Sequence, residues 1–242
     1  MKIQNLIIPV LFFLYLSSCS TKITTKSDVR LISALFAPYI NDMSNAVTII
    51  QKHELIANLT HLMTMDNGGR KYYLLEYEHI NEMIGNVTQQ LYEDMIIINS
   101  SYTILFSMKS IDLYGRRLSQ LSPMLHYFVS NLPYDDIAIY KPFEYPPMSG
   151  NYSFCICYPI QINDRNKGFC IGLINQNKFY DILPADSIIA ETNGQVIFNI
   201  IQRGSLKLDE DKLNKSSINV SGKNYTISLL QYKNITWYIL YP

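Results

Sequence analysis

The sequence predicts an α+β fold in which long N-terminal helices pack on antiparallel sheets, arranged as two units of which the second is small. Three observations predict it. Apolar residues recur every three or four positions up to about residue 93. From Ile96 the period falls to two, and β-branched and aromatic residues alternate with short turns. The 242 residues suffice for one large domain or two small ones.

Two helices are expected in the N-terminal part of the chain. The first covers 28–63, where apolar residues recur at steps of three, four and seven. Pro38 predicts a kink in it, because proline lacks the amide proton and clashes with the preceding turn. The run Asp66-Asn67-Gly68-Gly69 should end it. The second helix is predicted over 73–93, with its apolar positions spaced by four.

Strands dominate the rest of the chain. A hairpin over 96–108 turns at Asn99-Ser100-Ser101, and a later hairpin joins strands 152–162 and 168–174. Between them we expect a helical or mixed segment over 113–129, a strand over 137–140 and a proline-rich loop. Ile97–Ser107 and Ile189–Asn199 share a strand–turn–strand pattern at a shift of 92 residues. Two last strands are predicted over 223–230 and 235–241.

The first residues have the features of an export signal. Lys2 precedes an apolar stretch of eleven residues, Leu6–Leu16, which is too short to span a membrane but typical of a signal peptide. Leu16-Ser17-Ser18-Cys19 then resembles the bacterial lipobox, in which a peptidase cuts before a lipidated cysteine. The alternative is an ordinary secretory signal with an incidental cysteine.

The lipobox resemblance implies a membrane anchor. We expect a signal peptide over 1–18 and a lipidated Cys19 with a polar tether over 19–27. Two or three acyl chains, palmitate among the usual ones, would hold the protein stably on a membrane. Ser20 follows the cysteine in place of aspartate, and by the enterobacterial sorting rule this weakly favours the outer membrane, facing the periplasm or exterior. No later run is long enough to span a bilayer.

Composition excludes some functions. Lysine plus arginine and aspartate plus glutamate both number 20, so the chain lacks the basic excess of a nucleic-acid binder.

Cys155 and Cys157 are two apart on a predicted strand and share a face, so they are poorly placed to bridge each other. Cys170 could meet one of them across the hairpin. The four histidines are scattered, and neither a metal site nor a cofactor is expected.

Several stretches resemble the extracytoplasmic double-Cache sensor domains, which carry a long N-terminal helix and two PAS-like antiparallel modules. The hairpin over 96–107, the segment Asp112–Arg117, and the strand pair 152–160 and 168–172 resemble parts of the distal module. Asn193–Ile197 resembles the turn that opens the proximal module. The resemblance covers 28–242. It implies helices plus a distal module over 28–184 and a small proximal module over 185–242.

The resemblance also implies a ligand pocket in the distal module, between its sheet and the crossing segment 112–140. A forked guanidinium, from Arg116 or Arg117, would hold a ligand anion. Tyr127, Tyr134 and Tyr140 would line the walls, Asp135 or Asp136 would accept a hydrogen bond, and Tyr158 would form the floor. For each tyrosine the alternative is core or surface packing, and for the arginines a solvated helix face.

The ligand expected there is small. The family's amino-acid binders place an aspartate after the last central strand, whereas this strand ends at Asn175, a weaker partner for an α-amino group. A small carboxylate or another neutral or anionic metabolite therefore fits better. The chain is expected to sense through a protein partner, without a signalling output of its own.

Two other functions stand beside ligand binding. An enzyme is not expected, because the chain shows no nucleophile elbow, H-E-x-x-H, phosphate loop or C-x-x-C. A structural or interaction lipoprotein of the cell envelope is the second reading, with the Cache-like fold as a docking surface.

Overall fold

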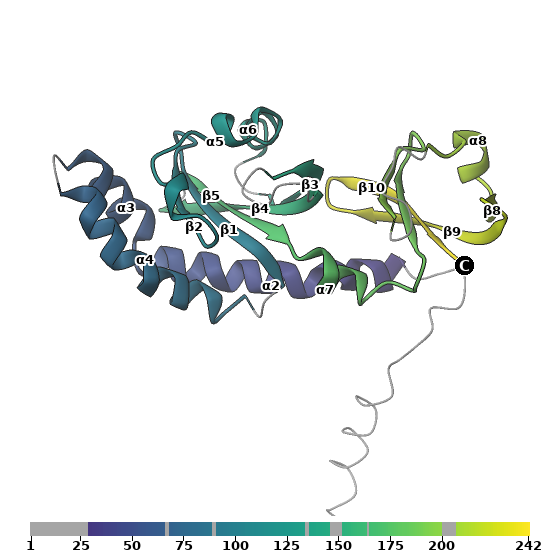
Figure 1. The fold of residues 1–242 in the computed structure, drawn as a ribbon, viewed down its shortest axis with the longest axis horizontal. Helices are drawn as coiled ribbons and strands as arrows, with labels where there is room; N and C mark the ends of the chain where they lie inside the picture. The colour runs from purple at the N-terminus through teal and green to yellow at the C-terminus, as the bar shows by residue number, and fades with distance from the viewer. Residues whose placement is uncertain are drawn as a thin grey trace, which may run out of the picture.

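The chain folds into two antiparallel five-stranded sheets with helices, as the sequence predicts (Figure 1). The computed structural model describes residues 29–65, 68–88, 91–133, 136–145, 152–163, 165–199 and 207–242. The predicted signal peptide, Cys19 with its tether, Tyr134 and Asp135 lie outside the described residues.

The N-terminal helical region contains three helices, whereas the sequence predicts two with other boundaries. Helix α2 (Val29–Lys52) runs through Pro38, and α3 (Leu55–Thr64) follows after Glu54, whose φ of 49° lies in the left-handed region. A left-handed residue ends the helical path, so one predicted helix is two. Helix α4 (Gly69–Gly85) ends eight residues before the predicted end at Glu93.

The first sheet has the strand order β2-β1-β5-β4-β3. Its strands are β1 (Tyr92–Asn99), β2 (Ile104–Ser107), β3 (Ala138–Glu144), β4 (Tyr152–Ile162) and β5 (Arg165–Ile174). The predicted second helix therefore overruns into β1, whose residues are nearly all buried. A strand that is apolar on both faces lacks the alternation that distinguishes it from a helix.

Each face of the first sheet has its own hydrophobic core. On one face Met95 and Ile97 pack against α2, which lies along the sheet with α3 and α4 beyond it (Figure 1). On the other face Ile96 and Ile98 pack under two short helices, α5 (Leu118–Leu121) and α6 (Pro123–Ser130). The 3-10 turn η1 (Ile111–Leu113) precedes them. The sheet is thus a middle layer between the long helices and the α5–α6 layer.

The second sheet repeats the first in strand order, β7-β6-β10-β9-β8. Its strands are β6 (Ile188–Glu191), β7 (Val196–Asn199), β8 (Ser217–Val220), β9 (Lys223–Tyr232) and β10 (Ile235–Tyr241). Helix α7 (Gln176–Tyr180) links the sheets, and α8 (Glu210–Leu213) lies over the second. Neither α8 nor β8 was predicted from the sequence.

The two opening hairpins match in register as well as in pattern. Ile97 pairs with Phe106, and Ile189 pairs with Phe198. In each hairpin a bulge follows, so that the next residue pairs one position beyond the partner that a regular register would give it. The similarity at a shift of 92 residues therefore corresponds to equivalent positions in two sheets of the same topology.

Candidate functional site

The α5–α6 layer is built to cover one face of the first sheet. Ser122 caps α6, its hydroxyl accepting a hydrogen bond from the Leu125 amide at 3.2 Å, and Pro123 occupies the first turn. Leu125 and Val129 are fully buried against the sheet. Met124 and Tyr127 point away from that core and are 64% and 73% exposed. The outer face of α6 therefore exposes two large apolar side chains.

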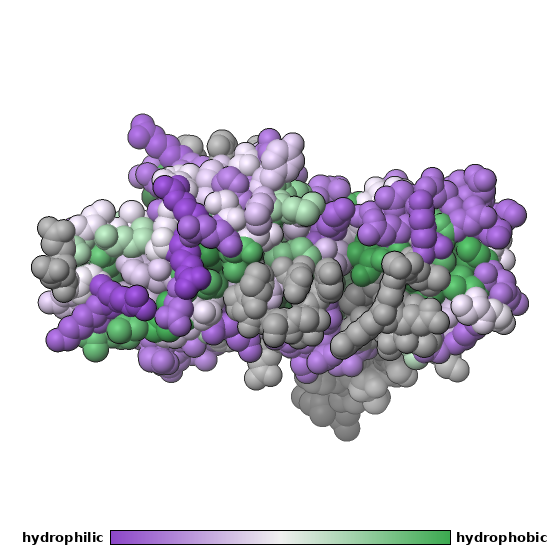
Figure 2. Space-filling view, turned by 45° about the horizontal axis from the view of Figure 1, so that its top comes forward, coloured by the Kyte–Doolittle hydropathy of each residue, from purple (hydrophilic) through white to green (hydrophobic). Residues whose placement is uncertain are grey.

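A groove of about 510 Å³ lies where α6 meets β3, the edge strand of the first sheet. We name it the α6–β3 groove, and its lining consists of Pro123, Met124, Tyr127, Phe128, Asn131, Leu132, Tyr140 and Lys141. The volume falls within the range of small-molecule sites. Figure 2 shows pale, weakly polar side chains over the α5–α6 layer, whereas strongly hydrophilic ones cover much of the second module.

From the lining residues Phe128 and Tyr140, a chain of aromatic rings continues behind the groove along β3 and just beyond it. The ring of Tyr140 lies 4.6 Å from that of Phe128 and 5.5 Å from that of Phe143, and Phe143 in turn contacts Tyr145. Tyr140 is only 7% exposed, and burial raises the pKa of its hydroxyl. The groove is thus backed by rigid, tightly packed side chains rather than by mobile ones.

A buried carboxyl group lies at the inner end of this aromatic chain. Asp94 on β1 is fully buried and accepts hydrogen bonds from the hydroxyls of Ser107, at 2.8 Å, and Tyr145. The Lys109 amide donates to its other oxygen at 3.2 Å. Burial raises the pKa of Asp94, although these hydrogen bonds oppose the shift. The carboxyl group of Asp94 therefore links β1 to the end of β2 and to the residue that follows β3.

The cysteines are distributed over both faces of the sheet. Cys155 and Cys157 share the face under α5–α6, as predicted, with their sulfur atoms 4.0 Å apart. Cys170 belongs to the core on the α2 face, so the suggested meeting across the hairpin is not found. All three are free thiols, and burial raises the pKa of Cys155 and Cys170. Within the described ranges no cluster of metal-ligating side chains occurs.

Strand β3 makes one of the contacts with the second module. The Asn234 carboxamide, in the β9–β10 turn, accepts from the Ile139 amide at 2.7 Å and donates to the Ile139 carbonyl at 2.8 Å. Beside it Lys233 pairs with Asp136 at 3.1 Å. The side chain of Asn234 thus completes the outer edge of β3 as a neighbouring strand would.

The structure brings together some of the predicted site residues. Tyr127 and Tyr140 both line the α6–β3 groove. Arg116 and Arg117 are exposed and lie beside β2, at the opposite edge of the sheet from β3. The Arg117 guanidinium donates to the Ser101 carbonyl at 2.8 Å, which explains its position without a ligand.

The other predicted site residues lie away from the groove's lining. Tyr158 is half-buried in the core on the α2 face, the opposite face of the sheet from Tyr140. Asn175 caps α7, accepting from the Lys178 amide at 3.2 Å. Asp136 pairs with Lys233 of the second module. Each of these three has a structural partner of its own.

Most of the groove's lining is absent from the predicted site residues. The unpredicted lining residues are Pro123, Met124, Phe128, Asn131, Leu132 and Lys141, and Asp94 lies behind them. Met124, Tyr127, Phe128 and Asn131 are spaced at three and four residues, so the helical period could have grouped them. Asp94 directly precedes an apolar run, which is the signal of a buried strand and could have pointed to it.

Comparison with known proteins places the fold. No family model and no curated protein matches the chain. Among solved structures, the L-alanine complex of the ligand-binding domain of the Pseudomonas fluorescens chemoreceptor CtaA matches with a TM-score of 0.58 and 11% identity, over 87% of this chain and 89% of that one. The sensor domain of the V. cholerae histidine kinase DctB matches with a TM-score of 0.56 and 13% identity, over 88% and 94%.

A larger protein shares the fold as well. An extracellular ligand-binding receptor from Desulfohalobium retbaense matches with a TM-score of 0.50 and 10% identity over 90% of this chain, which spans 40% of that receptor's length. At these identities the likeness shows the fold alone. The fold expected from the Cache resemblance, with two antiparallel sheets and helices, is thereby confirmed. No described helix is long and apolar enough to cross a bilayer.

Proposed function

We propose that this protein is a lipid-tethered, extracytoplasmic sensory protein that binds a small metabolite through its first module, at the α6–β3 groove. The observation that carries the proposal is the groove itself, which unites Tyr127 and Tyr140 in front of a chain of packed aromatic rings. It lies on the sheet face covered by the crossing segment, where the Cache resemblance implies the ligand site. The fold supports the proposal, since the CtaA domain with this fold holds L-alanine.

A binding experiment tests the proposal. The mature chain carrying Cys19→Ser is heated with each member of a metabolite panel, and its melting temperature is recorded. A ligand that binds only the folded protein stabilises it by RT ln(1 + [L]/Kd), about 2.7 kcal/mol at a hundredfold excess over Kd. We expect at least one metabolite to raise the melting temperature of the protein with an intact groove, and to raise that of Tyr127→Ala by less. A folded protein that no member of the panel shifts would contradict ligand binding.

The lipid tether is tested separately. If Cys19 is lipidated, the natural protein fractionates with membranes, and we expect the outer-membrane fraction. Cys19→Ser should move the protein to the soluble extract. A diacylglyceryl group enters only one leaflet, so a protein held this way would act on the cell interior through a partner. We include such a partner in the proposal and assign no catalytic step to the chain.

A docking function is the second candidate. The exposed apolar side chains of Met124 and Tyr127 on α6 favour it, since such residues are common in protein interfaces. A photo-crosslinking side chain at position 127 distinguishes the two functions in cells. Capture of one envelope protein, together with an unresponsive metabolite panel, would favour docking over ligand binding.

A further inference from the structure

The α6–β3 groove has an apolar lining with one charge at its edge. Met124, Phe128 and Leu132 supply apolar surface, and Tyr127 and Tyr140 supply ring faces. Among the described residues that line it, Lys141 alone carries a charge, and none carries a carboxylate. An apolar body can therefore bury its surface here, whereas a cationic group finds no counter-charge in the lining.

The polar groups of the groove differ in how firmly they are engaged. The Asn131 amide already donates to the Tyr127 carbonyl at 2.7 Å. The Lys141 ammonium is about half exposed and lies 3.7 Å from the nearest carboxylate oxygen of Glu191, beyond hydrogen-bond distance. The pair is only partly exposed, but its separation leaves no hydrogen bond, so it is weak and Lys141 remains available to another anion.

The nearby buried carboxyl group does not supply the missing counter-charge. Asp94 is fully buried, and its oxygens already accept from Ser107, Tyr145 and the Lys109 amide. A zwitterionic amino acid in the groove could pair its carboxylate with Lys141, but its ammonium group would have no counter-charge in the lining. That arrangement costs binding free energy, because an unpaired charge next to apolar surface loses its hydration.

We propose that the α6–β3 groove selects a flat apolar anion, such as an aromatic carboxylate, over amines and free amino acids. This inference rests on the proposed function and names the ligand class of the same groove. The ligand's apolar body lies against Met124, Tyr127 and Phe128, and its charge meets Lys141. In doing so it competes with Glu191 of the second module, so that binding alters a contact between the two modules.

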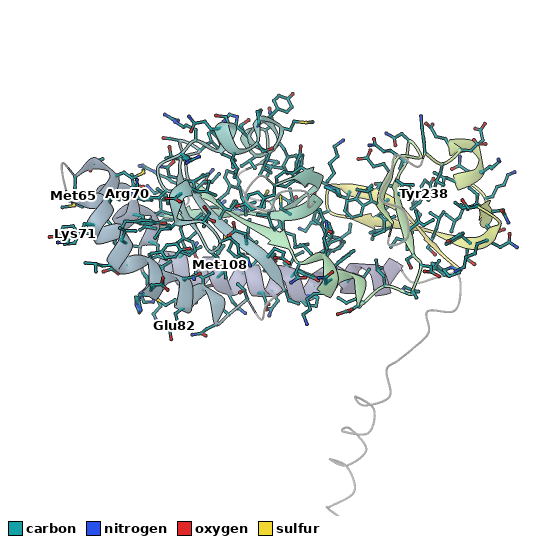
Figure 3. All side chains as sticks on the ribbon, viewed as in Figure 1. Met65, Arg70, Lys71, Glu82, Met108 and Tyr238 are labelled. Carbon is teal, nitrogen blue, oxygen red and sulfur yellow. The ribbon has the colours of Figure 1, made fainter. Side chains whose placement is uncertain are left out.

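A second apolar groove provides the control. It lies between α3 and α4, has a volume of about 430 Å³, and includes Tyr72, Met65, His61 and Glu76. Figure 3 labels Met65 at this end of the molecule, far from the second module. Tyr72 is 53% exposed on its helix, so Tyr72→Ala removes an exposed tyrosine from a helix surface, as Tyr127→Ala does.

Three naphthalene probes of one size and different charge test the inference. The mature chain carrying Cys19→Ser is titrated in detergent-free buffer with 2-naphthoate, 2-naphthylmethanol and 2-naphthylmethylamine, and binding is followed by probe fluorescence. We expect the acid to bind most tightly and the amine least. Tyr127→Ala should weaken all three about tenfold through lost ring contact, and Tyr72→Ala should change none of them.

Two charge variants must act in opposite directions. Lys141→Met should weaken 2-naphthoate about fivefold or less and leave the alcohol unchanged, as a half-exposed ion pair implies. Glu191→Gln removes the competing carboxylate and should tighten 2-naphthoate by a similar factor. The melting temperature of each variant shows that it is folded before binding is compared.

Several results would overturn the inference. Equal affinity for the amine and the acid, loss of binding in Tyr72→Ala instead of Tyr127→Ala, or no binding of any probe would each do so. The metabolite panel separates this failure from failure of the proposed function. If a metabolite shifts the wild-type protein but not Tyr127→Ala while the naphthalene order fails, the groove is a ligand site of another class. If neither series binds, both proposals fall.

Discussion

The contact of Asn234 with the edge of β3 yields the most detailed prediction. Its carboxamide makes two hydrogen bonds to Ile139, to the amide at 2.7 Å and to the carbonyl at 2.8 Å. Each such bond contributes about 0.5–1.5 kcal/mol net. Asn234→Ala should therefore lower the free energy of unfolding by about 1–3 kcal/mol, because both groups of Ile139 lose their partner at a partly buried site.

Two measurements test this value. Urea unfolding gives the change in stability, and hydrogen exchange at the Ile139 amide reports the lost bond directly. We expect exchange of that amide to become roughly five- to 150-fold faster in Asn234→Ala, the rate equivalent of about 1–3 kcal/mol of local opening. Asn234→Asp should protect the amide better than alanine does, since a carboxylate accepts from an amide but cannot donate to a carbonyl.

The control is an exposed asparagine on the same sheet. Asn224 accepts a side-chain hydrogen bond from Asn219 at 2.7 Å, and Asn224→Ala should change stability by no more than about 0.5 kcal/mol. Equal Ile139 exchange in the wild type and in Asn234→Ala would refute the reasoning, and so would equal destabilisation by Asn224→Ala.

Three further predictions concern the core of the first module. Burial raises the pKa of Asp94 above its ordinary 3.8, so the folded state binds a proton more tightly than the unfolded state does. The wild type should therefore lose stability as the pH rises from about 3.8 through the raised pKa of the folded state. Asp94→Asn should lack this component of the pH dependence. If the urea midpoints of the wild type and of Asp94→Asn changed with pH in the same way, the prediction would be wrong. A Cβ on Gly172 would lie 2.4 Å from Met43 and Tyr92 atoms, so Gly172→Ala should cost about 1–3 kcal/mol in urea unfolding, and an unchanged midpoint would show that these side chains move freely. The three described thiols are buried, so a thiol reagent at neutral pH should label none of them in the folded Cys19→Ser chain and all of them in urea; fast labelling of the folded chain would contradict the packing.

Much of the fold could be predicted because its signals are local. The change from a period near four to a period of two separates the helices from the sheets. The hairpins at Asn99 and Asn193 follow turn chemistry. Their shared pattern at a shift of 92 residues predicted two similar hairpins, and the structure adds that their registers match.

The differences between the predicted and the observed helices and strands also have physical reasons. Glu54 breaks the first helix in a left-handed conformation that glycine usually marks, so no residue signalled it. Strand β1 is buried on both faces, and its start therefore resembled helix. Short elements such as α8 and β8 depend on tertiary packing more than on propensity.

The site was predictable only in part. The Cache resemblance implied that Tyr127 and Tyr140, in the crossing segment, form walls of the pocket, and both line the groove. Nothing local told which edge of the sheet Arg116 and Arg117 would reach, because strand order is a property of the whole topology. The position of Tyr158 could have been read from parity: it lies an odd number of residues from Cys155 and Cys157, and so on the other face.

The most direct test of ligand binding is a crystal structure of the protein purified from its natural membrane with no ligand added. We predict density for a co-purified small molecule in the α6–β3 groove, in contact with Tyr127 and Tyr140. A guest bound only elsewhere, or a groove filled by the protein's own side chains, would contradict that assignment.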